Sequence, residues 1–220
     1  PMYGASESVV GDLLHAGGLR NRCFLATKVW TTGERRGIEQ MEASLAKLRA
    51  GRLDLMQVHN LVDWRTQLRT LRSWKEAGRI RYLGITHYQQ SAIEDVAAIV
   101  KAESLDFVQL NLSLDEPGVR PDFLRLCADR GVAFIANRPL GGGGVFARVR
   151  GTPLPPWAGE DDISSWAQFC LKWVLAHPEV TCAIPGTGNP RHLADNLGAA
   201  RGRLPDPAGR TRMERHWRSL

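Results

Sequence analysis

Apolar residues follow two spacings that alternate along the chain. Between residues 7 and 16, one helical face carries Val9, Val10, Leu13 and Leu14, and Gly17 is placed to end that helix. Short, continuous apolar runs rich in strand formers separate the helical segments. The pattern predicts strands at residues 23–30, 53–60, 82–88, 107–114, 132–140 and 181–186, and helices at 7–16, 38–48, 64–78, 91–103, 121–131, 164–178 and 190–200.

Single residues at the ends of these segments mark their boundaries. Ser91 is the expected N-cap of the helix at 91–103, and Asn189 that of the helix at 190–200. Pro121 suits the first turn of a helix. The Pro/Gly-rich stretch from Gly141 to Glu160 predicts a long loop, and the basic tail at 201–220 has room for one last helix.

Six strands that alternate with helices predict an α/β fold. Most of these strands are continuous apolar runs, which is typical of a parallel sheet buried on both faces. Such a sheet forms a TIM (β/α)₈ barrel or an open doubly wound fold. No GxGxxG motif follows the first strand, which favours the barrel. Because a barrel has eight strands in about 250 residues and this chain begins at Pro1, we expect a single barrel domain over residues 1–220 that lacks roughly its first two strands.

Composition excludes several classes of protein. Of 220 residues, 43% are hydrophobic and 24% charged, which suits a globular domain and excludes global disorder. No apolar run suits a membrane helix and no signal peptide is visible, so we expect no membrane association. The net charge of +6 is spread along the chain without a recognised motif, and we expect no nucleic-acid partner. The four cysteines lack metal-ligand spacing, and we expect no metal.

Polar residues that could do chemistry stand where strands end. In parallel α/β folds, the carboxyl ends of the strands meet at one mouth. Lys28 and His59 end successive strands, and Tyr3 lies in the loop after a strand that would precede this sequence. A Tyr hydroxyl, with a usual pKa of about 10, is a poor acid at pH 7. A neighbouring Lys ammonium favours the phenolate, and a His can hydrogen-bond the same oxygen or a substrate carbonyl.

In its motifs the chain resembles the aldo-keto reductases. The resemblance rests on Tyr3-Gly4 in PMYGASESVVGDLL, the Lys of FLATKVW, the His of LDLMQVHN, and on GRIRYLGITHY, FVQLNLSL and AIPGTGNPRHLADNL, in this order over nearly the whole chain. It implies a (β/α)₈ barrel and NAD(P)H-dependent reduction of an aldehyde or ketone to an alcohol. Tyr3, Lys28 and His59 match three members of the family's catalytic tetrad. The fourth, an Asp five residues before the Tyr, lies outside the sequence given.

The resemblance also implies where a cofactor binds. Thr86-His87 stands in place of the family's Ser-Asn at the nicotinamide carboxamide, and Asn137 replaces an aromatic that stacks on the nicotinamide ring. Gly186 and His192 stand where many NADPH-preferring members have Lys and Arg, although Arg191 lies beside them. We therefore expect NADP as cofactor, with only modest discrimination over NAD. The positions implied are Thr86, His87, Gln109, Asn137, Leu140, Gly142, Gly186, Thr187, Asn189, His192 and Asn196.

Two other functions fit the same residues. Since His87 and Asn137 depart from the family's pattern, the barrel could bind a dinucleotide as a sensor or regulatory subunit without useful turnover. Lys28 could instead form a Schiff base, as in aldolase-type barrels. The sequence leaves the identity of the small-molecule carbonyl substrate and the oligomeric state open.

Compartment and behaviour depend on what precedes the sequence. The stretch NRPLGGG looks most like a bacterial subgroup of the family, in which some members carry a twin-arginine export signal. We expect a cytoplasmic protein, with the periplasm as the alternative if such a signal lies upstream. Residues 1–220 alone would expose strand edges at 23–30 and 181–186. We expect that polypeptide to aggregate and to be inactive, and the same sequence with its upstream strands to be a soluble reductase.

Overall fold

A computed structural model describes residues 2–220, which form two compact units. The first comprises the residues up to His87 together with Glu103–Val108, and the second comprises Tyr88–Ala102 and Gln109–Leu220. Strand β4 (Phe107–Asn111) begins in the first unit and ends in the second. Parallel strands that alternate with helices make up both units, which confirms the predicted α/β class.

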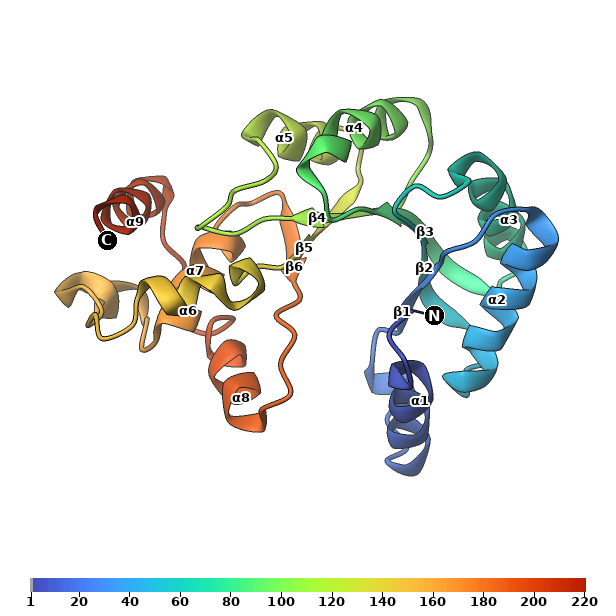
Figure 1. Cartoon of the computed structure of the whole chain (residues 1–220), viewed down its shortest axis with the longest axis horizontal. Coiled ribbons are helices and arrows are strands. Elements are labelled where there is room, and N and C mark those ends of the chain that lie inside the picture. The colour runs from blue at the N-terminus through green and yellow to red at the C-terminus, as the bar shows by residue number, and fades with distance from the viewer. Residues whose placement is uncertain (1) are drawn as a thin grey trace. The chain divides into compact units, whose positions relative to one another are not determined.

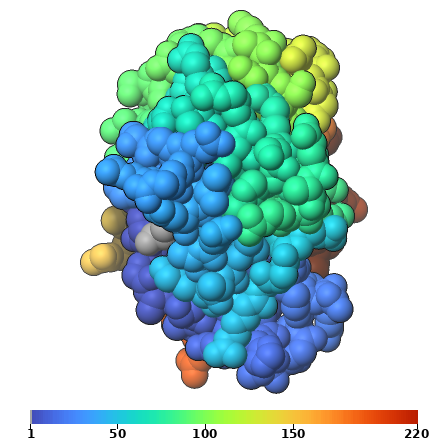
Figure 2. Space-filling model, turned by 90° about the vertical axis from the view of Figure 1, so that its right-hand side faces the viewer, coloured from blue at the N-terminus to red at the C-terminus, as the bar shows by residue number. Residues whose placement is uncertain are grey.

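The first unit is a parallel sheet with helices packed on it. Strand β1 pairs with β2, and β2 with β3, in parallel, and β2 is buried along its whole length. Helices α2 and α3 lie side by side on one face of these strands (Figure 1), and Figure 2 shows their outer surfaces. The elements are α1 (Ser6–Ala16), β1 (Ala26–Val29), α2 (Glu34–Lys47), β2 (Leu53–His59), α3 (Trp64–Glu76) and β3 (Ile80–Thr86).

Helices α3 and α1 differ in how much of their apolar face is buried. In α3, the buried residues Leu68, Leu71 and Trp74 recur at spacings that keep them on one face, as expected for an amphipathic helix on a sheet. The apolar face predicted for α1 is instead exposed. Helix α1 is buried at Gly11, where a Cβ atom would overlap the carbonyl oxygen of Lys47, so the backbones of α1 and α2 approach closely.

The second unit continues the alternation. The end of β4 is followed in the sheet by β5 and then by β6, which pairs with β5 in parallel. Helix α5 packs on β5 and α7 packs on β6. The elements after β4 and around it are α4 (Ile93–Ala102), α5 (Pro121–Asp129), β5 (Ala133–Asn137), α6 (Gly144–Arg148), α7 (Trp166–Leu175), β6 (Val180–Ala183), α8 (Pro190–Gly198) and α9 (Pro207–Ser219).

Two predictions about local structure are wrong. Ser91 is not an N-cap, because it lies inside a 3₁₀ turn at Gln90–Ala92 that leads straight into α4. Residues 141–160 are not one long loop, because they contain a 3₁₀ turn at Gly141–Gly143, helix α6, and the start of a 3₁₀ turn at Pro156–Asp161. In both places, residues that predicted a helix cap or a loop form short helical turns instead.

The predicted cap of α8 is confirmed. The Asn189 side chain accepts a hydrogen bond from the backbone N–H of Arg191 at 3.0 Å, and Pro190 occupies the first turn. The tail does hold a last helix, α9, whose N-cap Asp206 accepts from the N–H of Gly209. Across residues 2–220, no helix is both long and apolar enough to cross a bilayer, and no group of three or more His, Cys, Asp or Glu side chains could hold a metal ion.

Candidate active site

Three side chains predicted to be catalytic come together in the first unit. Lys28 lies in β1, His59 is the last residue of β2, and Tyr3 lies in the turn that leads into α1. The Lys28 Nζ atom lies 5.4 Å from the centroid of the Tyr3 ring, and the rings of Tyr3 and His59 are 6.3 Å apart. Because β1 and β2 are neighbouring parallel strands, their carboxyl ends present Lys28 and His59 at the same edge.

Exposure differs across this cluster. Tyr3 is 59% exposed, so its hydroxyl is accessible from solution, whereas His59 is buried. Trp30, which follows β1, packs near His59 with ring centroids 6.0 Å apart. The cluster therefore places an exposed tyrosine near a buried histidine.

Burial and charge keep His59 neutral. Desolvation and the positive charge of Lys28 both lower the pKa of His59, to about 4. At pH 7 the ring is therefore uncharged and can donate or accept a hydrogen bond, but it cannot serve as an imidazolium acid. Its Nδ1 atom is buried and has no hydrogen-bond partner among the described residues.

A mostly buried carboxylate, that of Glu7, acts electrostatically on Lys28. Its Oε1 accepts a hydrogen bond from the Thr27 hydroxyl at 2.6 Å, and its Oε2 lies 4.0 Å from the Nζ of Lys47. Burial lowers the pKa of Lys28, and the charge of Glu7 opposes that effect. Burial also raises the pKa of Glu7, but the Thr27 hydrogen bond and the Lys47 charge outweigh it and leave that pKa lowered. The negative charge of Glu7 thus favours the cationic form of Lys28.

Sequence reasoning did not select Glu7 as a site residue. The available signal was its position four residues after Tyr3, in the first turn of α1 and within the same motif. A glutamate in a first helical turn has an ordinary explanation, since carboxylates are stabilised there. Only the packing of α1 against β1 and α2 reveals that this carboxylate is mostly buried and acts electrostatically on Lys28.

Two cofactor-binding candidates share this edge of the first unit. Thr86, the last residue of β3, is paired in register with His59, and both are buried. His87 follows directly, is buried as well, and is close enough for its charge to contribute to the lowered pKa of His59. The structure therefore brings Thr86 and His87 to the strand ends that carry the predicted catalytic residues.

The remaining candidates lie in the second unit. Gln109 is buried in β4, and Asn137 ends β5. A further polar residue, Asn111, ends β4. The Asn111 amide nitrogen donates to the Tyr88 carbonyl at 2.6 Å, and its Oδ1 is buried without a partner among the described residues.

The glycine-rich stretch after β5 is an ordered turn. The N–H of Gly143 donates to the carbonyl of Leu140 at 2.8 Å, and Gly141, Gly142 and Gly143 all have positive φ. A side chain at these positions would be strained, so glycine is required for the backbone path. Leu140 and Gly142 therefore belong to a turn of defined shape.

The loop before α8 makes local contacts of its own. The Asn189 N–H donates to the Thr187 hydroxyl at 3.1 Å, and the Asn189 amide nitrogen lies 3.4 Å from Nε2 of His192. Space around Gly186 is open, with no atom within 4 Å of a Cβ placed there. Asn196 lies further along α8 and is buried. The open loop and helix start suit a phosphate group.

Comparison with known proteins decides the family. The model of the Aldo/keto reductase family matches residues 1–208. This chain belongs to the aldo/keto reductase family. The family assigned from the motifs is thereby confirmed, and the chain is an oxidoreductase of that family.

Individual aldo-keto reductases are distant in sequence. The chain is 27% identical to the methylglyoxal reductase YeaE of Escherichia coli (strain K12), with 88% of this chain and 69% of that protein covered. It is 26% identical to the aldo-keto reductase yakc [NADP(+)] of Schizosaccharomyces pombe, with 93% and 72% covered. A solved Klebsiella pneumoniae aldo/keto reductase in complex with NADP and acetate matches with a TM-score of 0.74 at 25% identity, over 96% of this chain and 75% of that one.

Proposed function

We propose that this aldo-keto reductase reduces an aldehyde or ketone to an alcohol with NADPH. The observation that carries the proposal is the cluster of Tyr3, Lys28 and His59 at one edge of the first unit. Two relatives support it by name, since one is a methylglyoxal reductase and the other is designated for NADP(+). A carbonyl substrate and a nicotinamide cofactor are consistent with those names.

Each residue of the cluster has its own role in the proposed reduction. NADPH, when bound, supplies the hydride that adds to the carbonyl carbon. The Tyr3 hydroxyl donates its proton to the carbonyl oxygen, and the Lys28 ammonium stabilises the negative charge left on the phenol oxygen. Neutral His59 hydrogen-bonds the carbonyl oxygen and orients it. Because Tyr3 is exposed, it regains its proton from water.

The chain's own residues suit the parts of the cofactor. Buried amide and hydroxyl groups can hydrogen-bond a carboxamide, the ordered glycine turn allows close approach of a pyrophosphate, and the start of α8 favours a phosphate. Arg191, exposed in the first turn of α8, supplies the positive charge for a 2′-phosphate. The proposed contacts are Thr86, His87, Gln109, Asn137, Leu140, Gly142, Gly186, Thr187, Asn189, His192 and Asn196.

Substitution of the phenol tests the proposal. In the natural protein at its full length, Tyr3→Phe removes the proton donor while retaining the ring. Loss of a general acid lowers turnover by about 10²- to 10⁴-fold, whereas NADPH affinity, followed by fluorescence quenching, stays unchanged. Near-normal turnover of methylglyoxal by the variant would contradict the proposal.

The other functions predict different results. Tight NADPH binding by the unmodified protein, without activity on a panel of aldehydes, ketones and quinones, would indicate a sensor instead. Covalent trapping of a carbonyl substrate on Lys28 by borohydride would indicate Schiff-base chemistry. Each result would replace the reductase proposal.

A further inference from the structure

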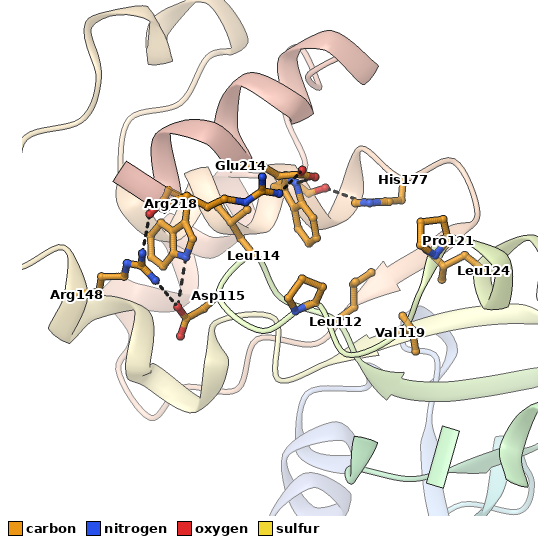
Figure 3. Close-up of a pocket in the computed structure, with 13 residues that line it drawn as sticks. Leu112, Leu114, Asp115, Val119, Pro121, Leu124, Arg148, His177, Glu214 and Arg218 are labelled. Atoms are coloured by element: carbon orange, nitrogen blue, oxygen red, sulfur yellow. Dashed lines mark hydrogen bonds and ion pairs between the residues drawn. The ribbon is translucent and has the colours of Figure 1, made fainter. Parts of the chain in front are cut away.

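A cavity in the second unit contains none of the residues assigned to the proposed reaction. It has a volume of about 290 Å³ and is walled by α7, α9 and the segment between β4 and α5 (Figure 3). An apolar cavity of about 150 Å³ is enough to bind benzene. This cavity can therefore hold a molecule of one ring with substituents.

One wall of the cavity is apolar. Leu112, Leu114, Val119 and Leu124 line it, and each is at most 4% exposed to solvent. Figure 3 shows Leu112, Leu114 and Val119 along the segment between β4 and α5, and Leu124 on α5. Such a wall favours an apolar ligand, because contact with it removes apolar surface from water.

The first pair of charges at the cavity is already neutralised. The Arg148 guanidinium lies 3.2 Å from Oδ1 of Asp115 and also donates to the carbonyl of Trp217 at 2.8 Å. The indole N–H of Trp217 donates to the same Asp115 oxygen at 3.3 Å. Arg148 and Asp115 thus compensate each other and hold α9 at the cavity.

The second pair of charges is neutralised in the same way. Glu214 accepts a hydrogen bond from the indole N–H of Trp173 at 3.2 Å, and its other oxygen lies 3.3 Å from the Arg218 guanidinium. The four charged side chains that line the cavity are therefore all paired. A charged ligand would have to lose its hydration without gaining a free counter-charge, so a neutral ligand is favoured.

His177 adds one hydrogen-bond acceptor. Its Nδ1 lies 3.0 Å from the Trp173 carbonyl and 3.3 Å from the Val174 carbonyl, so Nδ1 carries the proton. Burial, together with the charge of Arg210, lowers the pKa of His177, which keeps the ring neutral at pH 7. Its Nε2 then has a lone pair and has no hydrogen-bond partner among the described residues.

We propose that this cavity binds a small, neutral, mainly apolar molecule with one hydroxyl group, an alcohol or phenol of about one ring, which donates a hydrogen bond to Nε2 of His177. The proposal goes beyond the reductase activity, because it uses none of the residues that the reaction requires. Trp173 and Trp217 supply flat apolar surface in the same cavity, which suits a ring.

Three small probes of similar shape test the proposal on the unmodified protein. p-Cresol, toluene and benzoate share a ring and differ in carrying a hydroxyl group, no polar group, or a negative charge. By ligand-observed NMR titration, p-cresol is expected to bind about three- to tenfold more tightly than toluene, which is the range that one hydrogen bond accounts for. Benzoate is expected to bind more weakly than p-cresol. Equal binding of p-cresol and toluene, tighter binding of benzoate, or no saturable binding of p-cresol would overturn the proposal.

Two variants with matched controls locate the site. His177→Phe is expected to remove the preference for p-cresol over toluene, whereas His15→Phe on the exposed side of α1 leaves it unchanged. Leu124→Trp fills the cavity and is expected to weaken both probes more than tenfold, whereas Leu13→Trp at an exposed position has no effect. Circular dichroism confirms that each variant is folded. Unchanged binding in both cavity variants would place the probes elsewhere and contradict the proposal.

Discussion

At the scale of single residues, His59 links the chemistry of the site to the stability of the fold. Burial and the neighbouring Lys28 disfavour its charged form, so its pKa falls from 6.5 to about 4 in the folded chain. In the unfolded chain the ring is hydrated and titrates near its ordinary value. The two states therefore bind protons differently between these pH values, and folding stability depends on pH there.

We predict that the free energy of unfolding decreases as the pH falls from 7 towards 4. The unfolded state takes up a proton as the pH passes about 6.5, whereas folded His59 takes one up only near 4. The full difference amounts to about 3 kcal/mol, at about 1.4 kcal/mol for each pKa unit. Urea unfolding at several pH values measures it. The variant His59→Gln should lose the part of this pH dependence that His59 contributes, whereas His177, whose pKa is also lowered, keeps its own part. An unchanged slope would contradict the assignment.

Glu7 gives a second prediction at the residue scale. Because its charge raises the pKa of Lys28 against the effect of burial, Glu7→Gln lowers the pKa of Lys28 further. Lys28 then loses its proton at a lower pH, so the alkaline limb of the kcat profile moves to lower pH. Glu42→Gln on the surface of α2 is the matched control. A merely structural role for Glu7 would lower stability and leave the position of the limb unchanged.

The sequence predicted the placement of candidate residues that lie at strand ends, and their catalytic role stays a prediction. Lys28 and His59 lie at the ends of apolar strands, and the structure places them together with Tyr3 as expected. Glu7 was not selected, because its surroundings depend on the packing of α1 against β1 and α2. The local sequence pattern does not show whether a glutamate in a helix is exposed or mostly buried. The His192 ring lies near the N-cap Asn189, 3.4 Å from its amide nitrogen, and its contact with the cofactor stays a prediction.

At the scale of elements, the position of α1 governs the site, because Tyr3 directly precedes this helix. Helix α1 is tied to the rest of its unit by the Glu7–Thr27 hydrogen bond and by close approach to α2 at Gly11. A methyl group at Gly11 would overlap the backbone of Lys47 and Leu48, which cannot rotate away as a flexible side chain could. The helix must shift to accommodate it.

We therefore predict that Gly11→Ala displaces α1 and with it Tyr3. Turnover should fall at least tenfold, and overpacking of this kind costs about 1–3 kcal/mol of stability. Gly51→Ala is the control, since no atom lies within 4 Å of a Cβ at that position and its φ is not in the left-handed region. Kinetics and thermal unfolding of both variants measure the effects. Equal behaviour of the two would show that the α1–α2 contact does not position Tyr3.

Most elements could be predicted from periodicity, and the exceptions have a physical cause. The strands and long helices follow continuous apolar runs and helical faces, which persist over many residues. Helix α6 and the 3₁₀ turns near it are short and rich in Gly and Pro, so local composition indicates a loop. Their order comes from hydrogen bonds such as that from Gly143 to Leu140, which the pattern of apolar residues does not encode.

At the scale of the whole molecule, the family and the α/β class were predictable, but the exposed faces were not. The spacing of apolar residues predicted an apolar face for α1. That spacing does not indicate which part of the molecule, if any, covers the face. In the structure Val9, Val10 and Leu13 are exposed on it, as are Leu193 and Leu197 on α8. The aggregation expected of residues 1–220 alone is consistent with such faces and stays a prediction.

We propose above that the Tyr3 cluster serves reduction of a carbonyl by NADPH. The most direct measurement follows a label from the cofactor to the product. The natural protein at full length is mixed with methylglyoxal and NADPH deuterated at the transferable position of C4, and the product alcohol is analysed by mass spectrometry. We expect one deuterium on the carbinol carbon with the unmodified protein. With Tyr3→Phe at equal cofactor occupancy, we expect labelled alcohol to fall by about a hundredfold or more. Unlabelled alcohol, or equal labelling by the variant, would contradict the proposal.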